Sequence, residues 1–323
     1  MTEAISPNLG LDLLRVTETA ALAAGRWMGR GNAVISNRKA ARAMTEALNT
    51  LNIDGYIVIG EEGRTGESSP LNSGKSVGNG DGPEMDVVVD PIDGTDFLIM
   101  GQPDAVSVAG IAPRNSMWAP APAVYMDKIV VGAEAAESLV PECLDAPAAW
   151  TLALVARVKG KSVRDLVVFV LDRPRHKDLI EEIRSTGARV TARSHGDVAG
   201  ALMAASKDIN VDILMGIGGI AEGVISACAV KSLSGAMLGR IAPQSAEERA
   251  AVKNANLDEN EILTCDEIVT GQNIYFTATG ITDGILLSGV NYRGDFAETE
   301  SIIIRCETGT RRIVHTEHLV KDV

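Results

Sequence analysis

The sequence predicts an α/β protein of two domains, and three features carry this prediction. The chain has 323 residues, of which 46% are hydrophobic and 23% charged, as in globular proteins large enough for two packed cores. Short β-branched runs gather in the first half of the chain, whereas strand and helix patterns alternate in the second half. Such alternation favours a parallel or mostly parallel sheet flanked by helices.

In the first half, apolar residues at helical spacing predict helices over 9–29 and 38–50. Residues 63–84 are rich in glycine, serine and asparagine, which predicts a long loop or β-ribbon. The strand patterns of this half cover 55–63, 85–90, 105–112 and 128–132.

In the second half, strands and helices are predicted to follow one another. The strand patterns cover 166–172, 188–192, 211–219, 273–280, 284–290 and 300–307. The helix patterns cover 175–187, 197–206 and 220–233. The change of rhythm falls near residues 150–160, so we expect one domain over 1–155 and a second over 156–323.

The formal net charge of −13 limits the possible partners. A chain this acidic offers no basic patch to nucleic acid or to an anionic membrane, and an anionic substrate would need local positive charge from side chains or cations. No apolar run reaches the roughly 18 residues of a membrane helix. The four cysteines lie far apart, and the N-terminus lacks the basic start and apolar run of a signal peptide. These features predict a cytoplasmic protein with reduced thiols.

The stretch VVVDPIDGTD at 87–96 is the first candidate site. Its apolar run predicts a buried strand, and the proline and glycine that follow predict a turn. This arrangement directs Asp90, Asp93 and Thr95 into one crevice at the end of the strand. Clustered carboxylate oxygens suit Mg²⁺ or Mn²⁺ better than zinc. An aspartate-rich capped turn without a metal is the alternative interpretation.

Two further segments could add ligands to this crevice. Glu61 follows the apolar run YIVIG, so it lies either at the same sheet edge or at a solvated strand end. The turn MGIGGIAEGV at 215–224 offers backbone N–H groups at a helix start, where a phosphate can bind. It matches neither the GxGxxG register nor a lysine-containing phosphate loop. Glu222 in this turn is a candidate ligand or a residue that stabilises the helix dipole.

Basic residues follow the strand at 166–172. Arg173, Arg175 and His176 could bind the anionic group that an acidic protein otherwise repels, or they could face solvent. His195 precedes a predicted helix that Asp197 could cap.

Together the motifs resemble class II fructose-1,6-bisphosphatase, a bacterial branch of the lithium-sensitive, metal-dependent sugar phosphatases. The resemblance covers nearly the whole chain and has the motifs in the order of that family. They are RVTETAALAAGRWMGRGN, YIVIGE, VGNGDGPEMDVVVDPIDGT, AVYMDKIVVG, LDRPRHKDLIEEIRSTGARV, GDVAGA, GIGGIAEGVISA and FTATGITDGILLSGV.

This resemblance implies a layered α/β/α/β/α fold of two domains and a phosphoric monoester hydrolase. The implied reaction removes the 1-phosphate of fructose 1,6-bisphosphate, or a phosphate of sedoheptulose 1,7-bisphosphate or a related sugar phosphate, with Mg²⁺ or Mn²⁺. It also implies a homodimer or homotetramer.

The resemblance assigns roles to particular residues. Asp90, Asp93 and Glu222 would hold one metal ion, and Glu61 would hold a second together with the residue at position 37. Thr95 would orient the attacking water. The implied contacts of the sugar phosphate are Tyr125, Arg173, Arg175, His195, Asp197 and Gly219.

The chain departs from the family's pattern around the second metal and the sugar. The loop that reads G-R-G-D-K-x-x-x-D in the family is GRGNAVISN here, so Asn37 stands where the family has a metal-binding aspartate. The family's D-G-D is HGD, with His195 at its start, and the threonine that often follows D-P-I-D-G-T is Asp96. An amide keeps an oxygen ligand but removes a charge. The alternative function is therefore a catalytically impaired homologue that binds a sugar phosphate as a sensor or regulatory protein.

Overall fold

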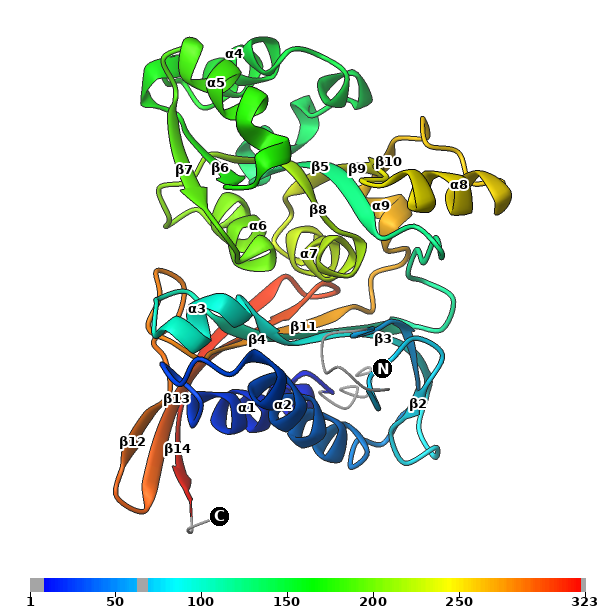
Figure 1. Cartoon of the computed structure of the whole chain (residues 1–323), viewed down its shortest axis with the longest axis vertical. Coiled ribbons are helices and arrows are strands. Elements are labelled where there is room, and N and C mark those ends of the chain that lie inside the picture. The colour runs from blue at the N-terminus through cyan, green and yellow to red at the C-terminus, as the bar shows by residue number, and fades with distance from the viewer. Residues whose placement is uncertain (1–8, 63–68, 321–323) are drawn as a thin grey trace, which may run out of the picture.

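The computed structural model describes residues 9–62 and 69–320, which form two β-sheets with helices between and around them (Figure 1). Within these residues the larger sheet has eight strands in the order β12-β13-β11-β4-β3-β1-β2, and β14 pairs with β13. Its strands are β1 (Asp54–Ile59), β2 (Ser76–Val77), β3 (Glu84–Asp93), β4 (Val106–Pro113), β11 (Tyr275–Gly280), β12 (Asn291–Arg293), β13 (Phe296–Arg305) and β14 (Thr310–Leu319).

The smaller sheet has the order β10-β9-β5-β8-β6-β7. Its strands are β5 (Tyr125–Val131), β6 (Val167–Leu171), β7 (Arg189–Arg193), β8 (Ile213–Gly219), β9 (Ala236–Ile241) and β10 (Leu263–Thr264). Strand β6 runs parallel to β7 and β8, whereas β5 is antiparallel to both β8 and β9. The expected parallel sheet is thus limited to the three strands that helical crossovers connect, because β5, β9 and β10 join from other parts of the chain.

The helices complete five layers in the order α/β/α/β/α (Figure 1). Helices α1 and α2 cover the outer face of the larger sheet, α6 and α7 lie between the sheets, and α4 and α5 cover the outer face of the smaller sheet. The predicted fold class is confirmed. The helices are α1 (Leu9–Gly25), α2 (Ala33–Leu48), α3 (Thr95–Met100), α4 (Ala148–Val158), α5 (Lys177–Ser185), α6 (Asp197–Ala205), α7 (Ile220–Ser232), α8 (Ala246–Asn254) and α9 (Cys265–Ile268).

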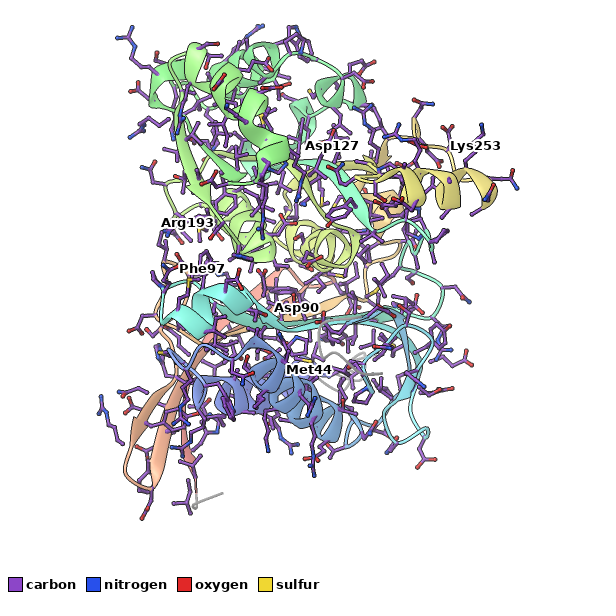
Figure 2. All side chains as sticks on the ribbon, in the orientation of Figure 1. Met44, Asp90, Phe97, Asp127, Arg193 and Lys253 are labelled. Atoms are coloured by element: carbon purple, nitrogen blue, oxygen red, sulfur yellow. The ribbon has the colours of Figure 1, made fainter. Side chains whose placement is uncertain are left out.

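Alternation of side chains along β3 explains which groups face the middle layer. Val87 and Val89 pack in the same cluster as Met44 of α2, whereas Val88 packs in the cluster that contains α6 and α7. Successive residues of a strand point to opposite faces, so Asp90 lies on the side of Val88. Figure 2 shows Met44 and Asp90 on opposite sides of this sheet.

The same alternation on β5 directs a charged side chain inward. Ile129 and Val131 pack in the cluster of α4 and α5, and Val130 packs in the cluster of α6 and α7. Lys128 therefore points into the middle layer, where it is completely buried. A lysine is almost never fully buried unless it is paired, so this position requires an acidic partner.

Two predicted boundaries and one predicted strand were wrong for identifiable reasons. Strand β3 continues through Pro91 to Asp93 instead of ending at Asp90, because a bulge in its pairing with β4 accommodates the proline. Helix α2 begins at Ala33 because Asn32 caps it, its Oδ1 accepting from Ile35 N–H at 3.0 Å. Residues 284–290 form no strand, since this segment folds on itself with Gly284 N–H donating to Leu287 O.

The two sheets draw on the chain in interleaved segments. Strand β5 precedes residue 155 but belongs to the smaller sheet, and β11 to β14 follow it but belong to the larger sheet. Whether 1–155 and 156–323 fold as separate domains stays a prediction. All four cysteines are free. No helix in the described ranges is long and apolar enough to cross a membrane.

Candidate active site

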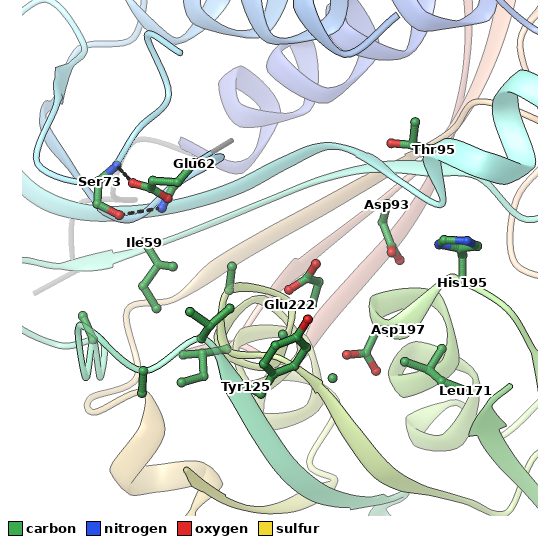
Figure 3. Close-up of a pocket in the computed structure, with 18 of the residues that line it drawn as sticks. Ile59, Glu62, Ser73, Asp93, Thr95, Tyr125, Leu171, His195, Asp197 and Glu222 are labelled. Carbon is green, nitrogen blue, oxygen red and sulfur yellow. Dashed lines mark hydrogen bonds between the residues drawn. The ribbon is translucent and has the colours of Figure 1, made fainter. Parts of the chain in front are cut away.

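A cleft of about 1370 Å³ lies between the two sheets at the ends of β3, β6 and β8. Figure 3 shows Asp93 and Thr95 on one side of this cleft, with Tyr125, Asp197 and Glu222 on the other. The predicted site residues that line the cleft are Asn37, Asp93, Thr95, Tyr125, Arg173, Arg175, His195, Asp197, Gly219 and Glu222. Asp90 and Glu61 are not part of the lining, although both are buried.

The bulge at the end of β3 lets Asp90 and Asp93 face the same side of the larger sheet, toward the middle layer. Residues three apart in a regular strand face opposite sides of a sheet, but the pairing with β4 shifts register between Asp90 and Asp93. Asp90 is 1% exposed, and its Oδ1 accepts from Ile92 N–H at 2.9 Å. Gly94 then adopts φ +91°, which permits the sharp entry into α3 at Thr95.

Asp93 connects the larger sheet to the middle layer. Its Oδ2 accepts from the N–H groups of Val198 and Ala199 at 3.1 and 3.2 Å, in the first turn of α6. Burial raises the pKa of Asp93 well above its usual range, and the neighbouring negative charges of Asp90, Glu222 and Asp197 raise it further, while the Ala199 amide opposes them. Asp93 therefore stands in an excess of negative charge.

The donors around Asp93 fit a hard divalent cation. All are carboxylates, the ligand type that Mg²⁺, Mn²⁺ and Ca²⁺ prefer, and a cation would offset their mutual repulsion. In the described part of the chain, no three acidic, histidine or cysteine side chains converge closely enough to form a complete metal site. Cation binding would therefore require these carboxylates to draw together.

The glycines at the end of β8 make room for acidic side chains. A Cβ on Gly218 would lie 1.8 Å from Asp197 Oδ2 and 2.4 Å from Lys128 Nζ. A Cβ on Gly219 would lie 2.0 Å from Glu222 Oε2. The glycine-rich turn is thus explained by the close approach of two carboxylates to the backbone.

Lys128 is the partner of Asp197, and the sequence analysis did not identify it. Its Nζ lies 2.6 Å from Asp197 Oδ2, and its side chain is fully buried. Removal of one partner from such a pair leaves an uncompensated buried charge. The available signal was a single lysine within the apolar run of β5, but its partner lies far away in the sequence.

Basic side chains of the segment that follows β6 also line the cleft. The Arg175 guanidinium donates to Ile217 O, with Nη2 at 2.8 Å, and lies 5.2 Å from the centre of the Tyr125 ring. His176, expected among the basic residues, is instead buried and links two backbone segments. Its Nδ1 lies 2.6 Å from Leu171 O. Its Nε2 accepts from Ile217 N–H at 2.7 Å, so the proton is on Nδ1 and the ring is neutral. Burial lowers the pKa of His176.

The region around position 37 is built differently. Asn37 is 7% exposed, its Nδ2 donates to Ala33 O at 3.0 Å, and its Oδ1 accepts from Thr95 Oγ1 at 3.2 Å. Glu61 is 3% exposed, and its neighbour Glu62 lines the cleft instead, accepting from Ser73 N–H at 2.6 Å (Figure 3). A second metal between Asn37 and Glu61 stays a prediction, and much of the acidic turn that follows Glu61 (63–68) lies outside the described residues.

Comparison with known proteins gives one consistent result. The profile of the family described as bacterial fructose-1,6-bisphosphatase, glpX-encoded, matches residues 7–318. The chain is 39% identical to a fructose-1,6-bisphosphatase class 2 of Haemophilus influenzae, over 98% of this chain and 97% of that protein. It is 38% identical to fructose-1,6-bisphosphatase 1 class 2 of Escherichia coli K12, over 96% of this chain and 95% of that protein.

Proposed function

The chain belongs to the family of bacterial, glpX-encoded fructose-1,6-bisphosphatases, and from this premise we propose that it hydrolyses the 1-phosphate of fructose 1,6-bisphosphate. This is a family of metal-dependent phosphatases, and the chain is accordingly a phosphoric monoester hydrolase. The observation that supports the proposal best is that one cleft is lined both by carboxylates around Asp93 and by the guanidinium groups of Arg173 and Arg175. Within such a cleft a bisphosphate can meet both a cation held by the carboxylates and the guanidinium groups.

We assign Asp90, Asp93 and Glu222 to one divalent cation, Mg²⁺ or Mn²⁺. Such an ion, when bound, would neutralise phosphate charge and lower the pKa of a coordinated water. Asp93 would also stay linked to the first turn of α6 through Val198 and Ala199 N–H. That link would limit how far Asp93 turns when the carboxylates draw together around an ion.

Thr95 is assigned to the attacking water. Its Oγ1 lies 3.2 Å from Asn37 Oδ1 and 3.3 Å from Ile92 O, and its single proton can satisfy only one of these acceptors. The lone pairs of the hydroxyl remain able to accept from a water. That water would form the new bond to phosphorus as the bond from phosphorus to the sugar oxygen breaks. The sugar oxygen takes up a proton, and the products are a free sugar hydroxyl and inorganic phosphate.

Arg173 and Arg175 are assigned to the phosphate that is not cleaved. Arg175 is fixed by Ile217 O and by the Tyr125 ring, and Ile217 is itself held by His176. A guanidinium anchored in this way loses little further rotamer freedom when it binds an anion. Tyr125, His195, Asp197 and Gly219 would complete the contacts of the sugar.

Sedoheptulose 1,7-bisphosphate is an alternative substrate of the same charge pattern. The choice of Mg²⁺ or Mn²⁺, a homodimer or homotetramer and a cytoplasmic location are further proposals that rest on the family resemblance. Light scattering on the purified protein tests the oligomeric state, because a monomer would contradict it.

A non-catalytic sugar-phosphate sensor is the second candidate. The observation that favours it is Asn37, a neutral amide whose two polar ends both have partners in the chain. A sensor would bind fructose 1,6-bisphosphate without a metal and without turnover.

Phosphate release separates the two candidates. The protein is incubated with fructose 1,6-bisphosphate, sedoheptulose 1,7-bisphosphate and sugar monophosphates, each with Mn²⁺, with Mg²⁺ or with EDTA. The enzyme releases phosphate from a bisphosphate with a divalent ion and loses that activity in EDTA. Absence of release from every substrate, in protein that still binds fructose 1,6-bisphosphate, would reject the enzyme in favour of the sensor.

A further inference from the structure

We infer that Asp96 and His195 form a matched pair that positions Arg173 at the edge of the cleft. The inference rests on the proposed function, because Arg173 is assigned there to the uncleaved phosphate. Asp96 lies in the first turn of α3, beside the larger sheet, and His195 lies in the turn between β7 and α6, beside the smaller sheet. The distance from His195 Nε2 to Asp96 Oδ2 is 2.6 Å. The pair therefore joins the two sides of the cleft.

Both members of the pair stand at departures from the family's sequence pattern. The family pattern that the sequence resembles implies D-G-D with a carboxylate at position 195 and often a threonine at position 96, where this chain has His195 and Asp96. The carboxylate missing at position 195 is thus present on the side chain that contacts position 195.

The ring of His195 is held on a second side by Phe97. The two rings meet edge to face, with centroids 5.6 Å apart and an interplanar angle of 80°. His195 is 21% exposed and Asp96 is 48% exposed, so the imidazole forms the wall of the cleft and the carboxylate lies toward solvent. The negative charge of the pair therefore lies at the rim of the cleft and not on its wall.

Arg173 is the residue that this arrangement supports. Its Nη2 lies 3.1 Å from His195 Nδ1 and 3.4 Å from His195 Nε2. Because Nη2 is nearly equidistant from the two ring nitrogens, the guanidinium lies over the ring and not in line with either nitrogen. Guanidinium groups stack on aromatic faces in this way. Arg173 lines the cleft, so the orientation of the ring sets where its charge is presented.

Asp96 therefore acts on Arg173 only through His195. As a carboxylate acceptor it fixes the proton on Nε2 and the direction of the ring plane. Asp96 and His195 are positioning residues, and their contribution belongs to binding and not to the chemical step. A carboxylate at position 195 alone would face Asp96 and repel it. With a threonine at 96 the same carboxylate could instead pair directly with Arg173.

The test is a swap of the pair toward the family's pattern. The variants His195→Asp, Asp96→Thr and the double variant are assayed for phosphate release from fructose 1,6-bisphosphate with Mn²⁺. Each single variant is expected to raise KM about tenfold and to change kcat by less than about threefold, as loss of a uniform binding contact does. The double variant is expected to return KM to within about threefold of the wild type, because its carboxylate pairs directly with Arg173.

A remote histidine provides the matched control. His315 on β14 also contacts a carboxylate, with Nε2 3.3 Å from Glu300 Oε1, but it lies outside the cleft. His315→Asp makes the same chemical change and is expected to leave KM unaltered. Thermal unfolding of every variant shows whether the fold is intact.

The affinity of EDTA-treated protein for fructose 1,6-bisphosphate, measured by calorimetry, separates this inference from the proposed function. Absence of turnover in the wild type would contradict the proposed enzymatic function. The pair would still be supported if the affinity falls in each single variant and recovers in the double variant. Two results overturn the inference. One is that the effects of the single changes multiply in the double variant. The other is that kcat falls while KM and the calorimetric affinity stay constant.

Discussion

The two candidate metal positions of the cleft, around Asp93 and around Asn37, bury polar groups to similar depth but satisfy them in opposite ways. Asp93 is 5% exposed, and its pKa is raised by burial and then by the negative charges of Asp90, Glu222 and Asp197. Asn37 is 7% exposed, and both ends of its neutral amide are bonded within the chain. Asp93 lies in a cluster of negative charge, whereas the side chain at position 37 is neutral.

This difference indicates that charge, not shape, distinguishes the two candidate metal positions. An amide oxygen can ligate a cation, but it adds nothing to the electrostatic attraction that draws a dication from water. At the position around Asp93, a bound cation would offset the repulsion between carboxylates. At the position around Asn37, a cation would have to replace existing hydrogen bonds. We therefore expect the position around Asp93 to bind a cation without substrate, and the position around Asn37 to bind a cation only weakly.

The largest effect on stability is expected from Lys128→Met. The change leaves Asp197 buried without its cation and enlarges the negative charge on the Asp93 side. Loss of one partner of a buried ion pair costs about 3–5 kcal/mol. Urea unfolding at neutral pH measures this cost. Lys253→Met, at an exposed position of α8, is the control and should change stability by less than about 0.5 kcal/mol.

Asp93→Asn should separate activity from stability. The amide keeps an oxygen that can accept from Val198 and Ala199 N–H but removes the buried charge, so metal-free protein should gain about 1 kcal/mol. The same change should lower kcat by about 100- to 1000-fold because a cation ligand is lost. Phosphate release and thermal unfolding in EDTA provide the two measurements.

The exposed Asp178→Asn is the control for this substitution. A stability loss in Asp93→Asn comparable to its activity loss would indicate that the carboxylate is structural. The proposed imbalance of charge around Asp93 would then be wrong.

Asn37→Asp tests the other side of the comparison. A carboxylate cannot donate to Ala33 O as the present amide does, so metal-free protein should lose about 1–2 kcal/mol. Mn²⁺ should recover this loss and raise activity severalfold. Thermal unfolding with and without Mn²⁺ checks the prediction. A stable variant whose thermal unfolding does not change with Mn²⁺ would show that position 37 does not lie within reach of a cation.

The smallest effect is expected at His176, another neutral buried group with both ends bonded. Its pKa is lowered in the folded protein by burial, whereas the unfolded chain titrates near 6.5. The unfolded state therefore binds the extra proton first, and stability should fall as pH drops below about 6.5. In His176→Gln this part of the pH dependence should be absent. Unfolding curves between pH 5 and 8 decide the matter, with the exposed His315→Gln as control.

Local patterns were sufficient to bring Asp93 and Glu222 to one cleft, whereas their role as cation ligands stays a prediction. Asp90 and Asp93 lie at the end of the apolar strand β3, and Glu222 follows β8 and its glycine turn, so each residue's position depends on its nearest neighbours in sequence. The layered fold was implied by the family resemblance, whereas the strand and helix patterns alone predicted a mostly parallel sheet.

The residues that sequence reasoning missed depend on distant partners. Lys128 looked like part of an ordinary strand because Asp197, which explains it, lies on another layer. His176 looked like a third cation, and only its contacts with Leu171 and Ile217 show that it is neutral. The segment 284–290 has a strand-like composition, but its hydrogen bonds close a local turn. Tertiary contacts decided each of these cases.

The central claim is that the carboxylates around Asp93 form the principal cation site of this protein. Equilibrium binding of Mn²⁺, followed by electron paramagnetic resonance without substrate, tests it directly. The wild type should bind one tight Mn²⁺ per chain, Asp93→Asn should lose that ion, and Asn37→Asp should gain a second. Tight binding that survives in Asp93→Asn, or that is absent from the wild type, would contradict the claim.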